Sequence, residues 1–270
     1  MSIPHFFIDQ YIEGGAGDSV KLSLSEDVID HLHTLRLKAN ENIILVDRPG
    51  HAWKICLAAA PNKKDRTIEG SLLSELEDCQ ESELTLIQGI SVAERMDKTI
   101  RQVTELGVSR IIPLESERST VRLKAADRAK KRERWQRIAR GAAEQSGQLR
   151  YPTVENPVSL ADALGMLDDY DLLLFFWEEA EGGSLSEVMS GYVSQARTSE
   201  LSTGCATQSK AMRIALFIGP EGGFSQDEAE RIVAHGAHTL TLGHTILRTE
   251  TAAVVASALV LYHLGALGGS

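Results

Sequence analysis

The sequence predicts an α/β protein with a small β-barrel at its N-terminus and a larger domain built on a parallel sheet covered by helices. The first 75 or so residues are short apolar segments separated by Gly, Pro, Asn and Asp, which is typical of a small barrel. From Leu84 onward, apolar segments alternate with helical patterns, as in parallel sheets. Two later segments are continuous apolar runs, as expected for strands buried on both faces. We therefore divide the chain into residues 1–75 and 76–270.

In the N-terminal domain the sequence predicts five strands and one helix. Val, Ile, Phe and Trp fill the strand segments, and turn-forming residues bound them. The helix, Glu26–Leu37, places Ile29 and Leu32 at helical spacing. The acidic segment Ser74–Glu83 is expected to be a linker. The predicted strands are His5–Ile12, Ser19–Leu24, Glu41–Gly50, Ala52–Ala60 and Asp65–Leu73.

In the second domain, strands and helices alternate. Helical spacing of apolar residues identifies the helices, and a capping box, Ser225 with Glu228, opens one of them. The polar segment Ser194–Lys210 is expected to be an exposed loop, whose role stays open. The predicted strands are Leu84–Val92, Arg110–Glu115, Asp171–Glu178, Arg213–Gly219 and His238–Gly243. The predicted helices are Met96–Gly107, Arg128–Ser146, Ser184–Val193, one that ends near Gly236, and Thr249–Leu264.

Composition and charge exclude several classes of protein. The chain has 28 Lys and Arg against 38 Asp and Glu, a net charge of −10, so its whole surface does not suit a nucleic acid. It has no apolar segment of the roughly 18 residues that span a membrane, and no secretory signal. The cysteines Cys56, Cys79 and Cys205 match neither a zinc spacing nor a disulfide framework. We expect a cytoplasmic protein with reduced thiols, no membrane contact and no metal.

One segment is strongly basic. Residues 118–140 hold ten Lys and Arg against two acids, a net charge of +8. A solvated helix face is the default interpretation of such a charge run. Its concentration on an acidic chain favours local contact with a phosphate backbone.

The first candidate site is a glycine-rich loop between a buried strand and a capped helix. Ligands on parallel sheets bind beyond the carboxyl ends of the strands, and glycines let a ligand approach the backbone closely. The alternative is a tight turn that binds nothing. The loop consists of Ile218, Gly219, Pro220, Glu221, Gly222 and Gly223.

The second candidate site, Leu242–Ala252, also leads from a strand into a helix. It puts Arg248 at a helix N-terminus, where the helix dipole does not favour a cation. That placement suggests a partner that is anionic or rich in carbonyl groups. The alternative is a purely structural pair of Arg248 with Glu250 or Glu221. His244 is the only histidine near a candidate site, and the chain has no Rossmann, P-loop or nucleophile-elbow motif.

These two motifs together resemble the RsmE family of the SPOUT superfamily. The paired motifs are I-G-P-E-G-G at 218–223 and L-G-x-x-I-L-R-T-E-T-A at 242–252. The segments at 94–108, 113–119 and 134–147 agree with that family as well, so the resemblance covers most of the chain from about Leu84. The match of Leu35–Lys38 to the family is looser.

The resemblance implies an S-adenosylmethionine-dependent methyltransferase that modifies N3 of a uridine in bacterial 16S rRNA. It also implies a PUA-like barrel, a SPOUT domain with a deep trefoil knot, and a homodimer. The cofactor-binding residues it implies lie in the two loops: Ile218 to Gly223, then Leu242, Gly243, Ile246, Leu247 and Thr249. The resemblance also implies that the loop after Phe176-Trp177-Glu178 contributes a third wall of that site.

The resemblance puts Arg248 and Glu250 where the methyl group meets the base. Uridine N3 carries a proton, so either a base removes it or a cation stabilises the anion. Arg248 suits the second role, whereas Glu250 suits either a base or a residue that orients Arg248. The residues expected to contact RNA are Arg36, Arg95, Lys98, Gln102, Arg118 and Gln145.

Two other functions stay open at this point. One is a non-catalytic RNA-binding or ribosome-assembly factor, although pure RNA binding does not require both loops. The other is a SPOUT methyltransferase that acts on a different RNA atom, because a fold does not fix a function.

Overall fold

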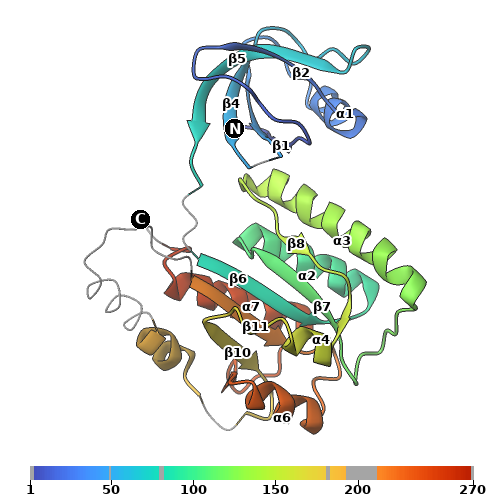
Figure 1. Cartoon of the computed structure of the whole chain (residues 1–270), viewed down its shortest axis with the longest axis vertical. Coiled ribbons are helices and arrows are strands. Elements are labelled where there is room, and N and C mark those ends of the chain that lie inside the picture. Colours follow the sequence, from blue (N-terminus) through green and yellow to red (C-terminus); the bar gives the residue numbers. More distant parts are fainter. Residues whose placement is uncertain (1–2, 49, 79–81, 181–182, 193–211, 269–270) are drawn as a thin grey trace. The chain divides into compact units, whose positions relative to one another are not determined.

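The computed structural model describes residues 3–48, 50–78, 82–180, 183–192 and 212–268. Figure 1 shows two compact units along the chain: Met1–Cys79 with Arg140–Arg150, and Gln80–Ala139 with Tyr151–Ser270. The predicted loop Ser194–Lys210, together with Cys79 and Cys205, lies outside the described residues.

The first unit is a five-stranded mixed sheet with one helix. Its strand order is β1-β3-β4-β5-β2, in which β1 pairs with β3 in parallel and the other pairs are antiparallel. Helix α1 (Glu26–Thr34) buries Ile29 and Leu32 in the core of this sheet. The strands are β1 (His5–Phe7), β2 (Ser19–Ser23), β3 (Asn42–Val46), β4 (Ala52–Leu57) and β5 (Thr67–Leu76).

The predicted linker Ser74–Glu83 is wrong at both ends. Strand β5 extends to Leu76, because its register with β4 continues to Ala52. Ser82 and Glu83 already pair with the central strand of the second sheet. The end of β5 and the start of β6 could not be predicted, because this acidic segment shows no alternation of apolar residues.

The second unit contains a parallel sheet, as the alternating pattern predicts (Figure 1). Its order is β12-β10-β11-β6-β7-β8, with β9 also paired to β7, and all these pairs are parallel. The five predicted strands of this domain are confirmed. They are β6 (Ser82–Gly89), β7 (Arg110–Glu115), β10 (Leu172–Phe176), β11 (Met212–Ile218) and β12 (His238–Leu240). The short strands β8 (Thr153–Val154) and β9 (Val158–Ser159) are not predicted from the sequence.

Helices cover both faces of this sheet, and two separate clusters form the core. Alternate residues of one strand divide between them: Leu174 joins one cluster, whereas Phe175 joins the other. The first cluster includes residues of α2 (Ala93–Leu106), α3 (Ala125–Ser146) and α7 (Thr249–His263). The second includes residues of α4 (Leu160–Leu164) and α6 (Gln226–Ala234). Residues 185–192 are helical, and the capping box of Ser225 and Glu228 at α6 is confirmed.

The topology brings the two candidate loops to one edge of the sheet. Because all strands are parallel, the loops after β6, β7, β10, β11 and β12 leave from the same edge. The chain then returns from the outer strand β12 to α7, which packs against α2 and against the central strands β6 and β11. The loop after β11 and the loop before α7 are therefore neighbours.

Candidate functional site

The glycine-rich loop lies directly on the end of β6. A Cβ atom added to Gly89 would lie 2.4 Å from both the backbone N and the Cδ of Pro220, and 2.8 Å from the carbonyl carbon of Gly219. Contacts this short with backbone atoms cannot be relieved by rotating a side chain. Gly89 therefore lets the 219–223 loop pack against β6.

Two more loops meet the same glycines. A Cβ on Gly222 would lie 2.9 Å from the carbonyl oxygen of Arg118, in the loop after β7. Gly223 has φ +66°, and a Cβ there would lie 2.5 Å from Oε1 of Glu178, in the loop after β10. The predicted third wall after Trp177 thus contacts the glycine-rich loop.

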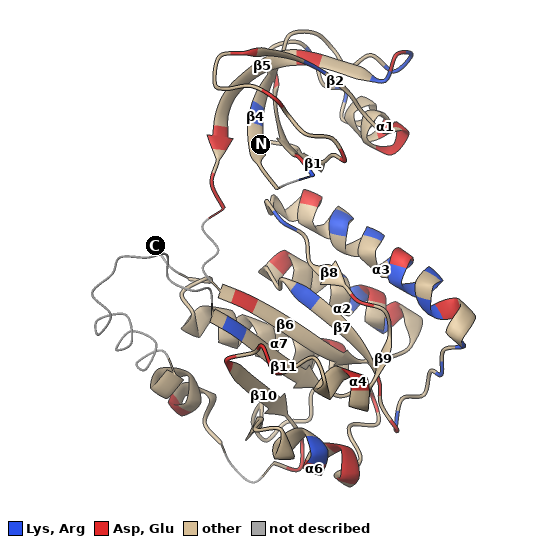
Figure 2. Cartoon of the chain, in the orientation of Figure 1, with Lys and Arg blue, Asp and Glu red and all other residues tan. Residues whose placement is uncertain are grey.

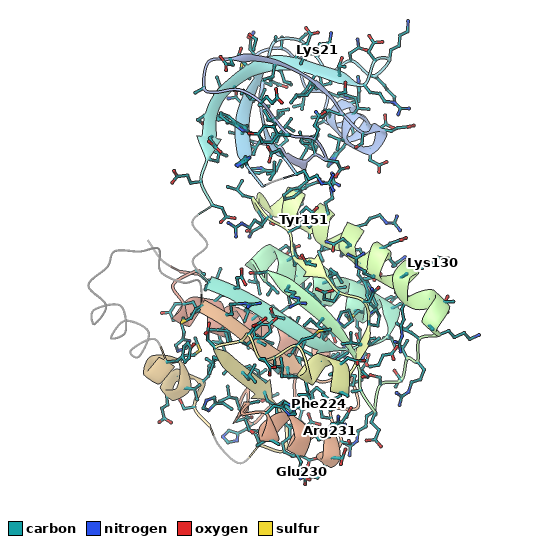
Figure 3. The ribbon with its side chains drawn as sticks, in the orientation of Figure 1. Lys21, Lys130, Tyr151, Phe224, Glu230 and Arg231 are labelled. Atoms are coloured by element: carbon teal, nitrogen blue, oxygen red, sulfur yellow. The ribbon has the colours of Figure 1, made fainter. Side chains whose placement is uncertain are left out.

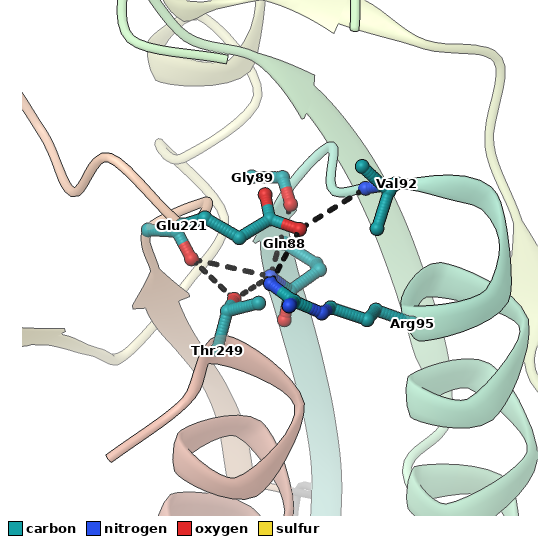
Figure 4. Close-up of polar contacts among 7 residues, drawn as sticks. Gln88, Gly89, Val92, Arg95, Glu221 and Thr249 are labelled. Atoms are coloured by element: carbon teal, nitrogen blue, oxygen red, sulfur yellow. Dashed lines mark hydrogen bonds and ion pairs between the residues drawn. The ribbon is translucent and has the colours of Figure 1, made fainter. Parts of the chain in front are cut away.

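A buried hydrogen-bond network ties the glycine-rich loop to the start of α7 (Figure 4). The side-chain amide of Gln88 donates to Thr249 Oγ1 at 2.9 Å and to the carbonyl oxygen of Gly219 at 3.4 Å. The Thr249 hydroxyl donates to that same carbonyl at 2.5 Å. Thr249, expected in the cofactor site, therefore holds the two loops in register.

Glu221 fastens the same loop to α2. Its Oε1 accepts from the backbone N–H of Val92 at 3.2 Å and from Nη1 of Arg95 at 3.1 Å (Figure 4). The sequence assigns Glu221 to the cofactor and Arg95 to RNA, and the structure joins them in one ion pair. Arg95 is half-exposed, so this pair adds little to overall stability. Its effect is to fix the loop.

Glu221→Ala is expected to lower the affinity for the ligand of this loop by about tenfold, because Val92 N–H and Arg95 lose their shared acceptor. Isothermal titration calorimetry with S-adenosylmethionine measures this. Glu94→Ala, an exposed acid on the first turn of the same helix, is the matched control. Equal affinities of the two variants would contradict the role given to Glu221.

Arg248 and Glu250 flank Thr249 at the start of α7. Arg248 is the N-cap residue, and its exposed side chain has no partner among the described residues. The structural alternative, in which Arg248 pairs with Glu250 or Glu221, is therefore not observed there. Glu250 is only 6% exposed, and its Oε2 has no hydrogen-bond partner in the described part of the chain. The start of α7 therefore carries an exposed guanidinium at Arg248 and, two residues on, a buried carboxylate at Glu250.

The rest of the second loop is open. Ile246 is 86% exposed, which is unusual for a large apolar side chain. Gly243 has φ +104°, and its N–H donates to Thr241 Oγ1 at 3.2 Å. Leu242 packs against the core of the sheet. Leu247 is half-buried, and His244 is exposed.

Several buried polar atoms at this edge have no partner among the described residues. Such atoms are rare in folded proteins and indicate a bound group or a strained site. They are Oε1 of Gln88, Oγ of Ser91, Nε1 of Trp177, Oε2 of Glu221 and Oε2 of Glu250. They include acceptors and donors, which is the chemistry that a polar ligand with N–H, O–H and acceptor groups would pair with.

A second carboxylate positions the loop that carries Arg118. Glu228, which is 5% exposed, accepts from the backbone N–H of Ser225 at 3.0 Å and of Glu117 at 2.8 Å. The capping box of α6 thereby fixes the residue before Arg118. Arg118 itself is exposed and has its backbone against Gly222.

The other residues expected to contact RNA are spread over both units. Lys98 and Gln102 lie on α2, with Lys98 exposed and Gln102 half-buried. Arg36, with φ +56°, is exposed beyond the end of α1. Gln145 is exposed on the part of α3 that belongs to the first unit.

The basic segment 118–140 is partly structural. Figure 2 shows its charged positions along the ribbon of α3, and Figure 3 shows the side chain of Lys130 on that helix. Arg134 pairs with Asp97 at 2.5 Å, and this hydrogen bond raises the pKa of Arg134. Four others bind groups of the chain: Arg122, Arg128, Arg132 and Arg140. Those without a partner among the described residues are Arg118, Lys124, Lys130, Lys131 and Arg137.

The described residues contain no cluster of three or more His, Cys, Asp or Glu side chains that could hold a metal. No helix in that part of the chain is long and apolar enough to cross a membrane.

Sequence reasoning missed Gln88, Gly89 and Glu228 as site residues. A glycine inside a predicted strand is a signal for close backbone approach, and Gly89 carried that signal. Gln88 carried one too, as a polar residue within an apolar strand. Glu228 was identified only as a helix cap.

Residues 78–261 match the family of RNA methyltransferase domains. The chain is 28% identical over 248 residues to ribosomal RNA small subunit methyltransferase E of Bacillus subtilis, covering 92% of each chain. Against the enzyme of the same name from Aquifex aeolicus, identity is 28% over 235 residues, covering 86% of this chain and 90% of that one.

Among the solved structures that are similar over nearly the whole chain are two that hold a cofactor. One is ribosomal RNA small subunit methyltransferase E of Neisseria gonorrhoeae bound to S-adenosyl methionine, with a TM-score of 0.77, 30% identity, and coverage of 97% of this chain and 98% of that one. The other is a methyltransferase of Legionella pneumophila in complex with the same cofactor, with a TM-score of 0.76, 27% identity and the same coverage.

Proposed function

From the premise that the chain belongs to the RsmE family of RNA methyltransferases, we propose that it transfers a methyl group from S-adenosylmethionine to N3 of a uridine in 16S rRNA of the small ribosomal subunit. The observation that carries this proposal is the hydrogen-bonded contact between the glycine-rich loop and the start of α7, which Gln88, Thr249 and Gly219 make at one edge of the sheet. Arg248, which is exposed, and Glu250, which is buried, flank Thr249 in this contact. A small-subunit rRNA substrate implies that the reaction occurs in the cytoplasm.

The cofactor fits the residues of this edge. The glycine-rich loop lies beyond the carboxyl end of β11, where parallel sheets bind their ligands, and the buried polar atoms without a partner among the described residues include donors and acceptors suited to a polar group such as S-adenosylmethionine. The residues proposed to hold it are Ile218, Gly219, Pro220, Glu221, Gly222, Gly223, Leu242, Gly243, Ile246, Leu247 and Thr249. Ile246, an exposed large apolar side chain, would supply apolar contact to the cofactor. The return of the chain from β12 to α7 is consistent with the trefoil knot of the family.

S-Adenosylmethionine supplies an electrophilic methyl group on a sulfonium. The chain's own task is to orient the base and manage the proton on N3. Arg248 stabilises negative charge on the uracil carbonyl oxygens as N3 loses its proton. Glu250, buried two residues away, accepts that proton or orients the guanidinium. Thr249 fixes the spacing between the two side chains.

The residues proposed to contact RNA include exposed cations near this edge of the sheet and residues of the first unit. Arg118 lies against Gly222, and Lys98 is exposed on α2. Arg95 is already bound to Glu221, so its proposed RNA contact is made while it holds the cofactor loop. Arg36, Gln102 and Gln145 complete the proposed set.

The test uses labelled S-adenosylmethionine, purified protein and small ribosomal subunits that lack the modification. The rRNA is digested, and the labelled nucleoside is identified by mass spectrometry. We expect 3-methyluridine in 16S rRNA. Label in another nucleoside would refute the N3 target, and cofactor binding without any transfer would favour a missing partner or a different RNA. Failure to bind the cofactor would favour a non-catalytic RNA-binding protein.

We also propose that the protein is a homodimer formed through α7. This helix buries Ala253 and Val260 on one side but leaves Leu259 40% exposed and Tyr262 63% exposed on the other. Large apolar side chains exposed together on one helix are typical of an interface.

Tyr262→Asp is expected to shift the protein from dimer to monomer, because it places a charge within the proposed interface. Size-exclusion chromatography with light scattering measures the mass. Tyr151→Asp, at an aromatic residue that is 38% exposed outside α7, is the control. A Tyr262→Asp variant with the mass of the unmodified protein would refute this interface.

A further inference from the structure

We infer that Gln88 is a positioning residue of the transfer reaction, which holds Arg248 and Glu250 at a fixed place relative to the glycine-rich loop. The inference rests on the proposed function. Gln88 is the penultimate residue of β6, a central strand of the parallel sheet, and its side chain is fully buried. A buried amide at this depth requires partners for its polar atoms.

Two of its three partners come from segments far away in the sequence. The Nε2 group donates to the carbonyl oxygen of Gly89 at 3.0 Å, to that of Gly219 at 3.4 Å and to Thr249 Oγ1 at 2.9 Å (Figure 4). Three acceptors around one nitrogen fix the orientation of the amide, since a flipped amide would place an oxygen against the two carbonyl oxygens. The Gln88 amide therefore has a single orientation in this hydrogen-bond network.

The same contacts reach the proposed reacting groups through one residue. Thr249 is the first residue of α7 and lies between Arg248 and Glu250. Its hydroxyl accepts from Gln88 and donates to Gly219. Gln88 and Thr249 thus bind the same carbonyl oxygen, and this links the start of α7 to the loop that holds the cofactor. A small displacement of such groups lowers the rate steeply.

Gln88→Leu is the informative variant, because leucine has a similar size but donates no hydrogen bond. We expect kcat to fall by about 10- to 100-fold. Thr85→Val is the matched control: Thr85 is buried on the same strand and accepts from the Tyr170 hydroxyl at 2.9 Å. Both variants lose one buried hydrogen-bonding group, so both should melt at lower temperatures. Only Gln88→Leu should lose turnover beyond about twofold.

Thr249 provides the second arm of the test. Thr249→Ser keeps the hydroxyl and should lose less activity than Thr249→Val, which should fall as Gln88→Leu does. If Gln88 and Thr249 act through the same hydrogen-bond network, removing both should cost little more than removing one. The double variant Gln88→Leu/Thr249→Val should then be no more than about threefold slower than the slower single variant. A double variant whose kcat falls by the product of the two single fold-decreases would overturn the inference.

Hydrogen exchange measured by mass spectrometry tests this hydrogen-bond network without any reaction. Peptides that cover residues 219–224 and the first turn of α7 should exchange faster in Gln88→Leu than in the unmodified protein, and at the unmodified rate in Thr85→Val. This result is expected even if the unmodified protein transfers no methyl group, an outcome that would refute the proposed function alone. Unchanged exchange in Gln88→Leu, or equal losses of turnover in Gln88→Leu and Thr85→Val, would overturn the role of Gln88.

Discussion

Arg248→Ala is expected to lower kcat by about 10²- to 10³-fold while changing the affinity for S-adenosylmethionine by less than about threefold. The reason is the environment of the side chain. The side chain of Arg248 is exposed at the N-cap of α7 and has no hydrogen-bond or ion-pair partner among the described residues, so its removal breaks no such interaction there. The loss then falls on the stabilisation of charge that develops during transfer. Single-turnover rates with labelled cofactor and calorimetric cofactor affinities separate the two quantities.

The controls for Arg248 test charge and position separately. Arg248→Lys keeps the charge but loses the planar fork that donates to two oxygens, so we expect an intermediate rate. His244→Ala removes another exposed polar side chain from the same loop and should keep the rate within about threefold. If Arg248→Ala weakens cofactor binding as much as it slows transfer, Arg248 belongs to the cofactor site and not to the reacting groups.

The two loops could be predicted from the sequence because their signals are local. Pro220 and the glycines around it predict a sharp turn after a buried strand, and the capping box of Ser225 and Glu228 predicts the next helix. Strand β11 and helix α6 have the predicted order, and their short connection carries the site. Such signals depend on residues only a few positions apart.

The contacts that assemble the site are not local and could not be predicted. Arg95 and Glu221 are 126 positions apart, and Gln88 and Thr249 are 161 positions apart. Their meeting follows from the order of strands, which places β11 beside β6. The residue pattern indicates parallel strands but not which strand neighbours which. The sequence consequently assigned Arg95 to RNA alone.

The basic segment shows a second limit of sequence reasoning. A net charge of +8 over residues 118–140 counts Arg128 and Arg134 as free cations. The structure pairs Arg128 with Glu115, and Arg134 with Asp97, acids that lie outside the segment. The charge available to a phosphate backbone is smaller than the sequence suggests, and it lies with the unpaired residues such as Lys130.

Gly89→Ala is expected to weaken cofactor binding by about 10- to 100-fold, the equivalent of about 1.4–2.7 kcal/mol. The added methyl group would lie 2.4 Å from the backbone N of Pro220 and 2.8 Å from the carbonyl carbon of Gly219. Since β6 is fixed between two strands, β11 and β7, the glycine-rich loop has to move. Overpacking of this kind also lowers the free energy of unfolding by about 1–3 kcal/mol. Calorimetry and thermal unfolding measure the two effects.

Gly141→Ala is the matched control, because it adds the same methyl group where no described atom outside the neighbouring helix backbone lies within 4 Å. Gly141 is in the interior of α3, where alanine is favoured over glycine by about 0.5–1 kcal/mol. The control should therefore be slightly more stable and bind the cofactor normally. If Gly89→Ala loses stability but binds the cofactor as tightly as Gly141→Ala, the glycine-rich loop can shift without harm to the site. In that case the close packing of Gly89 and Pro220 serves the fold, and cofactor recognition rests on the loop before α7.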